Sequence, residues 1–223
     1  LLLPVVASAR PAQPRVSMIR DIGDGLAQLR RHKLARPLLV MEGMEHVPHG
    51  IWTSALMLVF VDRALDGEPS AWGLQNGMFF SGQVVGALVA TLAARTLARR
   101  AGWAIILDTA LNAALTVAYA LSPTNLVAVV VSFLFGPPYA IRDVAQDTLL
   151  QASVPGEVLG RIYALRDALR NAVFLLASTG FAILADYVPI RGIYLIGGGL
   201  YAVTALYALS SPALRAGRIE VGR

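Results

Sequence analysis

The first long apolar segment of the sequence carries four ionisable side chains at helical spacing. Glu42, Glu45, His46 and His49 stand at i, i+3, i+4 and i+7, which places them on one face of an α-helix. An ionisable group in the middle of a bilayer costs at least about 2.5–3.5 kcal/mol, so such groups usually serve a function. Buried acids and histidines can titrate near neutral pH. The stripe therefore predicts a water-accessible path for protons or substrate.

Two other interpretations of this stripe stay open. The four side chains could form a polar face that is only satisfied against another helix. Two acids and two histidines could also hold a metal ion, but the pattern is not HExxH and every ligand would come from one helix. The chain has no cysteine, which excludes Cys-ligated zinc and iron–sulfur sites. We expect no metal and no cofactor.

A second group of charges lies in a later apolar segment. Asp143 and Asp147 are i, i+4 neighbours, and Arg142 has the same spacing to Gln146. A buried arginine needs an anionic partner, which could come from Asp143, another helix or the substrate. The Gly-Pro-Pro run at 136–138 predicts a helix break nearby. The alternative is a purely structural ion-pair network.

Three other charged residues are expected to be structural. Asp108 could pair with the basic residues at 95–100. Arg166 and Arg170 could reach lipid headgroups by snorkelling.

The composition indicates that membrane-spanning helices position these residues. Of 223 residues, 56% are hydrophobic and 15% are charged, with a mean hydropathy of +0.61; soluble domains are about 25% charged. A spanning helix needs about 20 mostly apolar residues. The segments that qualify are 37–61, 71–94, 103–121, 125–150, 162–185 and 190–209. We expect an all-α membrane protein with a six-transmembrane-helix bundle.

The remaining segments are assigned from their length and charge. Residues 1–9 are apolar but too short to span, and we interpret them as the end of a preceding transmembrane helix. Residues 10–36 predict a basic cytoplasmic linker with an interfacial helix; a flexible linker is the alternative. Residues 37–212 form the bundle, and 213–223 form a cytoplasmic tail.

Basic residues gather on one side of the predicted bundle. Most of the 19 Lys and Arg residues precede the first span, follow the last, or lie between spans 2 and 3 or 4 and 5. Arg63 and Arg191 occupy the opposite side. The positive-inside rule then places both termini in the cytoplasm of a multi-pass protein of the plasma (inner) membrane. The basic residues are not interleaved with exposed aromatics, which speaks against nucleic acid as a partner.

Two glycine groups are expected to pack helices rather than bind nucleotides. Gly77, Gly82 and Gly86 lie in the second span, and residues 197–199 lie in the last. Walker A and GxGxxG patterns are absent from the sequence.

Four short segments together resemble one family of membrane proteins. They are DGLAQLRRH at 24–32, GALVA at 86–90 with RTLARR at 95–100, QASVPGEVLGRI at 151–162, and LSSPALR at 209–215. These segments resemble those of major facilitator superfamily transporters, in particular the enterobactin-exporter and macrolide-efflux-like branch. The pattern VPxExxGR at Val154–Arg161 is the most specific of them. The resemblance implies cytoplasmic gate and loop motifs at Arg95, Arg99, Arg100, Pro155, Glu157, Gly160 and Arg161.

The resemblance implies a fold and an activity for the chain. The six spans would be helices 7–12, half of a twelve-helix major facilitator fold, with residues 1–9 ending helix 6. The N-terminal six-helix half on the same chain, or a second copy, would be the partner. The activity would be proton-coupled export of a small amphipathic molecule, a drug or siderophore, by alternating access. Ala98 replaces the acid usual in that family's loop, and Asp143 stands where relatives often have Asn.

Two other functions are alternatives to transport. A membrane-embedded lipid or prenyl transferase needs clustered acids for Mg²⁺ and phosphate. Asp143 and Asp147 are the only close pair of aspartates within the predicted spans, so no enzyme is predicted. A non-transporting sensor, scaffold or truncated product stays open, because six spans enclose a two-bundle cavity only if two copies pair.

Overall fold

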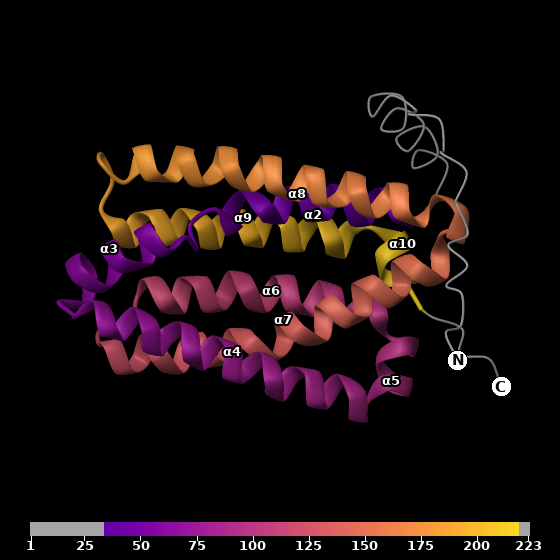
Figure 1. Cartoon of the computed structure of the whole chain (residues 1–223), viewed down its shortest axis with the longest axis horizontal. Coiled ribbons are helices and arrows are strands. Elements are labelled where there is room, and N and C mark those ends of the chain that lie inside the picture. The colour runs from indigo at the N-terminus through magenta and orange to yellow at the C-terminus, as the bar shows by residue number, and fades with distance from the viewer. Residues whose placement is uncertain (1–33, 219–223) are drawn as a thin grey trace, which may run out of the picture.

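The computed structural model describes residues 34–218, and these are helical apart from short connections (Figure 1). The helices are α2 (Ala35–His49), α3 (Ser54–Leu65), α4 (Pro69–Leu92), α5 (Ala94–Arg99), α6 (Ala101–Ala120), α7 (Asn125–Ser153), α8 (Gly156–Leu184), α9 (Ile190–Ser210) and α10 (Pro212–Arg215). The predicted helix end at 1–9 and nearly all of the predicted linker at 10–36 fall outside the described residues.

Four of these helices are long and apolar enough to cross a membrane. They are α6, α7, α9 and the part of α8 from Leu159 to Leu184. Large apolar side chains also point outward, such as Leu92, which is 88% exposed, and Leu176, which is 74% exposed. Such faces are stable in contact with lipid. Four of the six expected spans therefore have support, and the first two stay predictions.

The first expected span, 37–61, is two helices rather than one. α2 ends at His49, where the next three amides bond to carbonyls three residues back, as in Gly50 N to Val47 O at 3.1 Å. Pro48 has no amide hydrogen to continue the α-helical pattern. The Thr53 side chain then accepts a hydrogen bond from Leu56 N and begins α3. The sequence predicts a kink at Pro48. The structure shows more than a kink, because the helix is interrupted over residues 50–53.

The predicted break in the fourth span is wrong, because α7 continues through Pro137 and Pro138. Two glycines of α4 allow α7 to lie against it. A side chain at Gly82 would collide with the Phe133 carbonyl, and one at Gly86 with Pro137. Pro137 deprives the Phe133 carbonyl of its usual helical donor, and the Cα–H of Gly82 lies against that carbonyl instead. The close α4–α7 contact therefore supports the helix where its own hydrogen bonds are missing.

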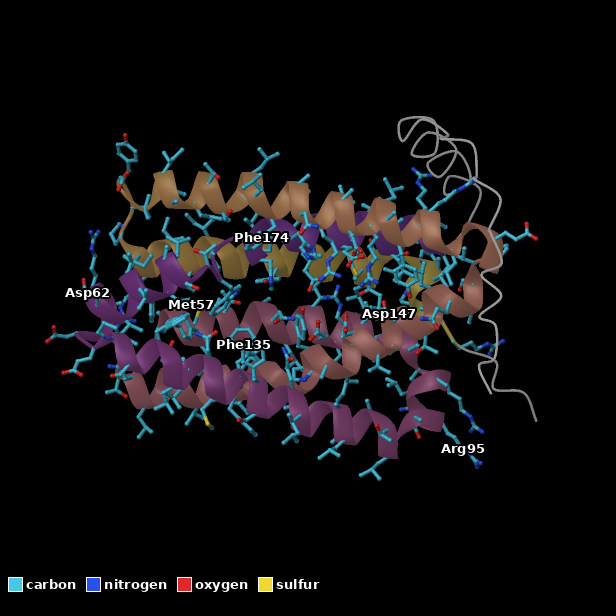
Figure 2. The ribbon with its side chains drawn as sticks, viewed as in Figure 1. Met57, Asp62, Arg95, Phe135, Asp147 and Phe174 are labelled. Atoms are coloured by element: carbon cyan, nitrogen blue, oxygen red, sulfur yellow. The ribbon has the colours of Figure 1, made fainter. Side chains whose placement is uncertain are left out.

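The helices form two layers (Figure 1). One layer contains α2, α3, α8 and α9, and the other contains α4, α5, α6 and α7. The main packing pairs are α4–α7, α6–α7, α6–α9, α2–α8 and α2–α9. Met57 and Phe135 point into the space between the layers, while Arg95 points outward at one end (Figure 2).

Arg191 joins three helix ends at the end of the bundle opposite α10. Its guanidinium donates to Ala120 O at the end of α6, at 2.5 Å, and to Ala64 O near the end of α3, at 2.8 Å. It also lies 5.6 Å from the centre of the Phe60 ring. Carbonyls at helix C-termini lack amide partners and attract a cation. Arg191 is therefore occupied inside the fold rather than presented to headgroups.

Candidate functional site

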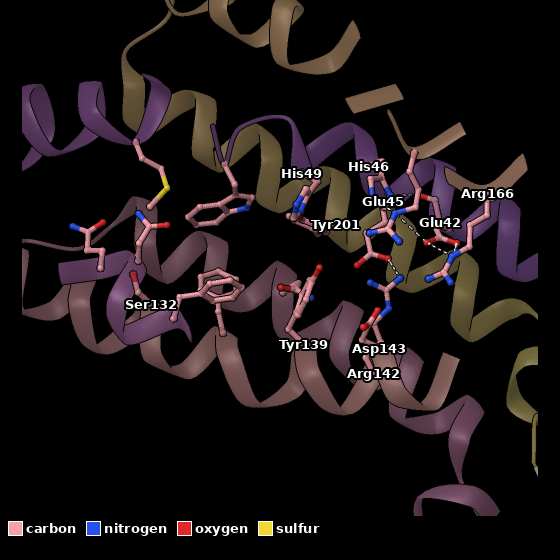
Figure 3. Close-up of a pocket in the computed structure, with 18 residues that line it drawn as sticks. Glu42, Glu45, His46, His49, Ser132, Tyr139, Arg142, Asp143, Arg166 and Tyr201 are labelled. Carbon is pink, nitrogen blue, oxygen red and sulfur yellow. Dashed lines mark hydrogen bonds and ion pairs between the residues drawn. The ribbon is translucent and has the colours of Figure 1, made fainter. Parts of the chain in front are cut away.

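The predicted stripe of α2 lines a cavity between the two layers (Figure 3). The cavity measures about 150 Å³. Glu42, Glu45, His46 and His49 all border it, as the helical spacing predicted. Arg142 and Asp143 of α7 lie across from them, and Asp147 lies one turn beyond, outside the lining.

Glu45 and Asp108 share one arginine. Arg142 donates from Nη2 to Glu45 Oε2, and both side chains are almost fully buried. Arg142 Nε lies 3.8 Å from Asp108 Oδ2, which also accepts a hydrogen bond from Asn112 at 3.0 Å. Arg142 Nε and Asp108 Oδ1 have no hydrogen-bond partner among the described residues. The sequence suggested that Asp108 pairs with the basic residues at 95–100. In the structure its carboxylate faces Arg142 instead.

Glu42 is the centre of a second cluster. Arg166 Nε donates to both of its carboxylate oxygens at 2.8 Å, and Gln146 donates to one of them at 3.0 Å. Arg166 also reaches Asp147 at 2.5 Å, and Arg170 Nε lies 3.5 Å from Glu42. Arg166 is only 4% exposed. The predicted snorkelling of Arg166 and Arg170 is therefore wrong, because both turn inward to a buried acid.

His46 is held in one neutral tautomer by its two hydrogen bonds. Arg170 Nε donates to its Nε2 at 3.1 Å, and an arginine can only donate. Its Nδ1 lies 2.8 Å from the Glu42 backbone carbonyl, which can only accept, so the ring proton is on Nδ1. His46 can take a further proton only after Arg170 releases Nε2. His49 is held more loosely, with Nδ1 3.4 Å from the Tyr201 hydroxyl.

Asp143 differs from the other acids of the site. It borders the cavity, and among residues 34–218 it makes no hydrogen bond or ion pair. Tyr139 stands one turn before it on α7 and borders the cavity as well.

The far end of the cavity is aromatic and was not predicted. Trp52, in the interruption between α2 and α3, packs edge-on against Tyr119, Phe135 and Tyr194, with ring centres 5.0–5.2 Å apart. Gln75 of α4 also borders the cavity and is 0% exposed. Its Oε1 accepts a 2.6 Å hydrogen bond from Tyr119, while its Nε2 has no partner among the described residues. The Gln75-Asn76 amide pair inside an apolar segment was the available signal.

The predicted gate residues lie apart from the cavity. Arg95 and Arg99 belong to α5, a short helix rather than a loop, and Arg100 follows it. Pro155, Glu157, Gly160 and Arg161 lie at the start of α8, near the same end of the bundle (Figure 1). All seven are exposed, and none borders the cavity. Their gating role stays a prediction.

The acids and histidines of the site do not form a metal centre within the described part of the chain. Across residues 34–218, no three His, Asp or Glu side chains are grouped closely enough to hold a metal ion. Arginines occupy the carboxylates of Glu42 and Glu45 instead.

The sequence has distant relatives among bacterial transporters. No family model matches the chain. It is 28% identical over 181 residues to YjbB of Bacillus subtilis strain 168, named an uncharacterized MFS-type transporter, covering 81% of this chain and 45% of that protein. It is 24% identical over 191 residues to YfmI of the same organism, named likewise, covering 86% and 47%. The chain thus spans about half the length of these curated relatives. Neither name mentions enterobactin or macrolides.

Proposed function

Because the chain is a distant homologue of transporters of the major facilitator type, we propose that it is the C-terminal six-helix half of a secondary active transporter. The two relatives are transporters and not enzymes, and the chain is a multi-pass membrane protein. Its partner would be an N-terminal half on the same chain, or a second copy. The cavity of α2 and α7 would face that partner, and alternating access would follow from movement of the two bundles.

The observation that carries this proposal is the cluster of Glu45, Asp108 and Arg142 beside the cavity. Glu45 and Asp108 share one guanidinium, so the cluster lacks one positive charge when both acids are ionised. A proton can supply that charge. Protonation of Glu45 would weaken its bond to Arg142 and leave the guanidinium to Asp108, at 3.8 Å in this state. A proton that changes the partner of a buried cation is a means of coupling.

The proposed proton path includes Glu42, Glu45, His49 and Asp143, with His46 joining it once Arg170 moves. The proposed direction is export of a small amphipathic molecule, a drug or siderophore. A cavity with a charged end and an aromatic end suits such a molecule. Both termini are proposed to be cytoplasmic. Arg191 supports this orientation, because its guanidinium bonds to helix ends inside the fold. Among residues 34–218, Arg63 is then the exposed arginine on that side of the bundle.

The test uses the full-length transporter in liposomes that contain the pH dye pyranine. Ethidium, Hoechst 33342, erythromycin and a catecholate siderophore are added one at a time, and substrate-driven proton movement is recorded. Glu45→Gln should abolish proton movement, whereas Asp62→Asn, an exposed acid at the other end of α3, should not. Proton-coupled transport by Glu45→Gln at the wild-type rate would overturn the coupling role. Absence of proton movement with every compound would argue against the function itself.

A further inference from the structure

Five buried side-chain atoms within residues 34–218 have no hydrogen-bond partner, and all five belong to one layer of the bundle. They are Trp72 Nε1, Gln75 Nε2, Asp108 Oδ1, Asn125 Oδ1 and Arg142 Nε, on helices α4, α6 and α7. Native proteins leave few such atoms unpaired, and ordered water pairs many of those that the chain does not. The layer of α4 to α7 therefore needs partners that its own side chains do not supply.

A buried polar stripe of α6 runs along this layer. Its side chains stand at spacings of four, four and three residues, which places them on one face of the helix, and none is more than 8% exposed: Asp108, Asn112, Thr116 and Tyr119. Asn112 donates to Asp108 at 3.0 Å at one end. Tyr119 donates to Gln75 at 2.6 Å at the other end. The stripe extends about 16 Å, which is about half the thickness of the hydrocarbon core of a bilayer.

The cavity connects the two ends of the stripe. Asn112 borders it beside Asp108. Gln75 and Asn76 border it at the aromatic end, and Asn76 donates to the Trp72 carbonyl at 3.0 Å in the first turn of α4. Trp72 is partly exposed, at the end of the bundle opposite α10. Polar groups therefore follow one another from that end of the bundle to Asp108.

Water suits every atom of this row, because the unpaired atoms are of both kinds. The nitrogens of Trp72, Gln75 and Arg142 need an acceptor. The oxygens of Asp108 and Asn125 need a donor. Water both donates and accepts, and a buried water usually makes about three hydrogen bonds. One water can serve both Arg142 Nε and Asp108 Oδ1, since Arg142 Nε lies 3.8 Å from the other oxygen of the same carboxylate.

Asp108 is the acid at the inner end of this row. The charged groups that face it are Arg142 and Asp143 of α7 and Glu45 of α2. α9, which also packs on α6, carries one charged residue, Arg191, at its far end. Transfer of a proton from water to the carboxylate makes Asp108 neutral and leaves the Arg142 guanidinium to Glu45.

We propose that ordered waters along Trp72, Gln75 and Asn112 form a proton entry route from the end of the bundle opposite α10 to Asp108. The proposal rests on the transport function above, since it names the way by which the coupling proton enters. In the proposed orientation this end faces outward. External protons would then reach Asp108 through the interior of this half and not through the face turned to its partner. The three route residues position water, and Asp108 accepts the proton.

Hydroxyl-radical footprinting of the full-length transporter in nanodiscs tests the hydration. Radicals made from an ordered water modify the side chain beside it, even where bulk solvent does not reach. Tyr119 should be modified faster than Met41, which is equally buried but lies in an apolar cluster, although methionine is easily oxidised. Gln75→Leu should lower the modification of Tyr119 roughly threefold or more. Gln83→Leu, the same change on α4 outside the cavity lining, should not.

The rate of Asp108 protonation tests the route itself. A light flash releases protons from a caged compound, and time-resolved infrared spectroscopy follows the carboxylic-acid band that Asp108→Asn removes. Gln75→Leu should slow the rise of this band roughly tenfold or more and leave its final amplitude unchanged, since Gln75 bonds to Tyr119 and not to Asp108. Trp72→Phe removes one donor at a partly exposed position and should also slow the rise, which provides the same test if Gln75→Leu does not fold. Trp103→Phe, at an exposed position of α6, should not.

Three outcomes would overturn the proposal. They are modification of Tyr119 no faster than that of Met41, a rise of the Asp108 band that is as fast in the route variants as in the wild type, and absence of the band. Neither measurement requires transport. A hydrated route to Asp108 in a protein that moves no protons with any compound would contradict the transport function and leave the route intact.

Discussion

Substitution of Arg142 by methionine should destabilise the bundle strongly, because it removes the cation that Glu45 and Asp108 share. Removing one partner of a buried ion pair costs about 3–5 kcal/mol. Here two carboxylates lose the same partner, and both are nearly inaccessible to water. We therefore expect a loss at the upper end, about 5 kcal/mol. Glu45→Gln in the Arg142→Met background should restore part of it, because only Asp108 is then unpaired.

The assay is unfolding of the full-length protein in mild detergent by titration with sodium dodecyl sulfate. Unfolding is monitored by tryptophan fluorescence. Arg170→Met is the matched control, since Glu42 keeps Arg166 and Arg170 is partly exposed. Its cost should stay within about 1 kcal/mol. The coupling between Arg142→Met and Glu45→Gln should exceed about 1 kcal/mol. Additive costs, or an equal loss in Arg142→Met and Arg170→Met, would refute the shared-cation interpretation.

Three further predictions concern packing, helix ends and orientation. Gly82→Ala should lower the free energy of unfolding by about 1–3 kcal/mol in the same titration, because the new Cβ meets the Phe133 carbonyl. Gly77→Ala has open space around it and should have no such effect. Equal effects of the two substitutions would show that the α4–α7 contact is not tight. Arg191→Met should lower the free energy of unfolding by about 3 kcal/mol, because it removes two charge-assisted hydrogen bonds. Arg63 is exposed, and Arg63→Met should change stability very little. Unchanged stability of Arg191→Met would mean that water replaces the guanidinium. In a version of the transporter without other cysteines, Ala216→Cys should react with a membrane-impermeant maleimide only from the cytoplasm and Tyr187→Cys only from outside; labelling of both from one side would contradict the predicted orientation.

Hydropathy located most of the helices but could not locate the interruption between α2 and α3. Averages over about 20 residues pass across Gly50–Thr53, since Ile51 and Trp52 are themselves apolar. The local signals were present in Pro48, Gly50 and Thr53. For Pro137 and Pro138 the local signal pointed the other way, and tertiary contact with the α4 glycines kept α7 helical.

The sequence predicted the residues of α2 and, on α7, Arg142 and Asp143, which also border the cavity, but it did not predict which of these side chains pair. Helical periodicity placed Glu42, Glu45, His46 and His49 on one face, and all four border the cavity. Their partners stand far away in the sequence, 97 residues for Arg142 to Glu45 and 124 for Arg166 to Glu42, so no spacing rule joins them. Arginines near the start of a spanning helix resemble headgroup anchors in sequence. The structure shows that Arg166 turns inward, because it is buried and donates to Glu42.

Two of the helix contacts in this bundle differ in the kind of group that holds them together. Along α4 and α7 the backbones touch at Gly82 and Gly86. α4 carries no Asp, Glu, His, Lys or Arg, so this contact contains no ion pair between the two helices. Along α2 and α8 the seam is fastened by Glu42 with Arg166 and Arg170, and one proton on Glu42 would undo several of its bonds at once. The α4–α7 contact is therefore independent of charge, whereas the α2–α8 contact depends on the ionisation of Glu42.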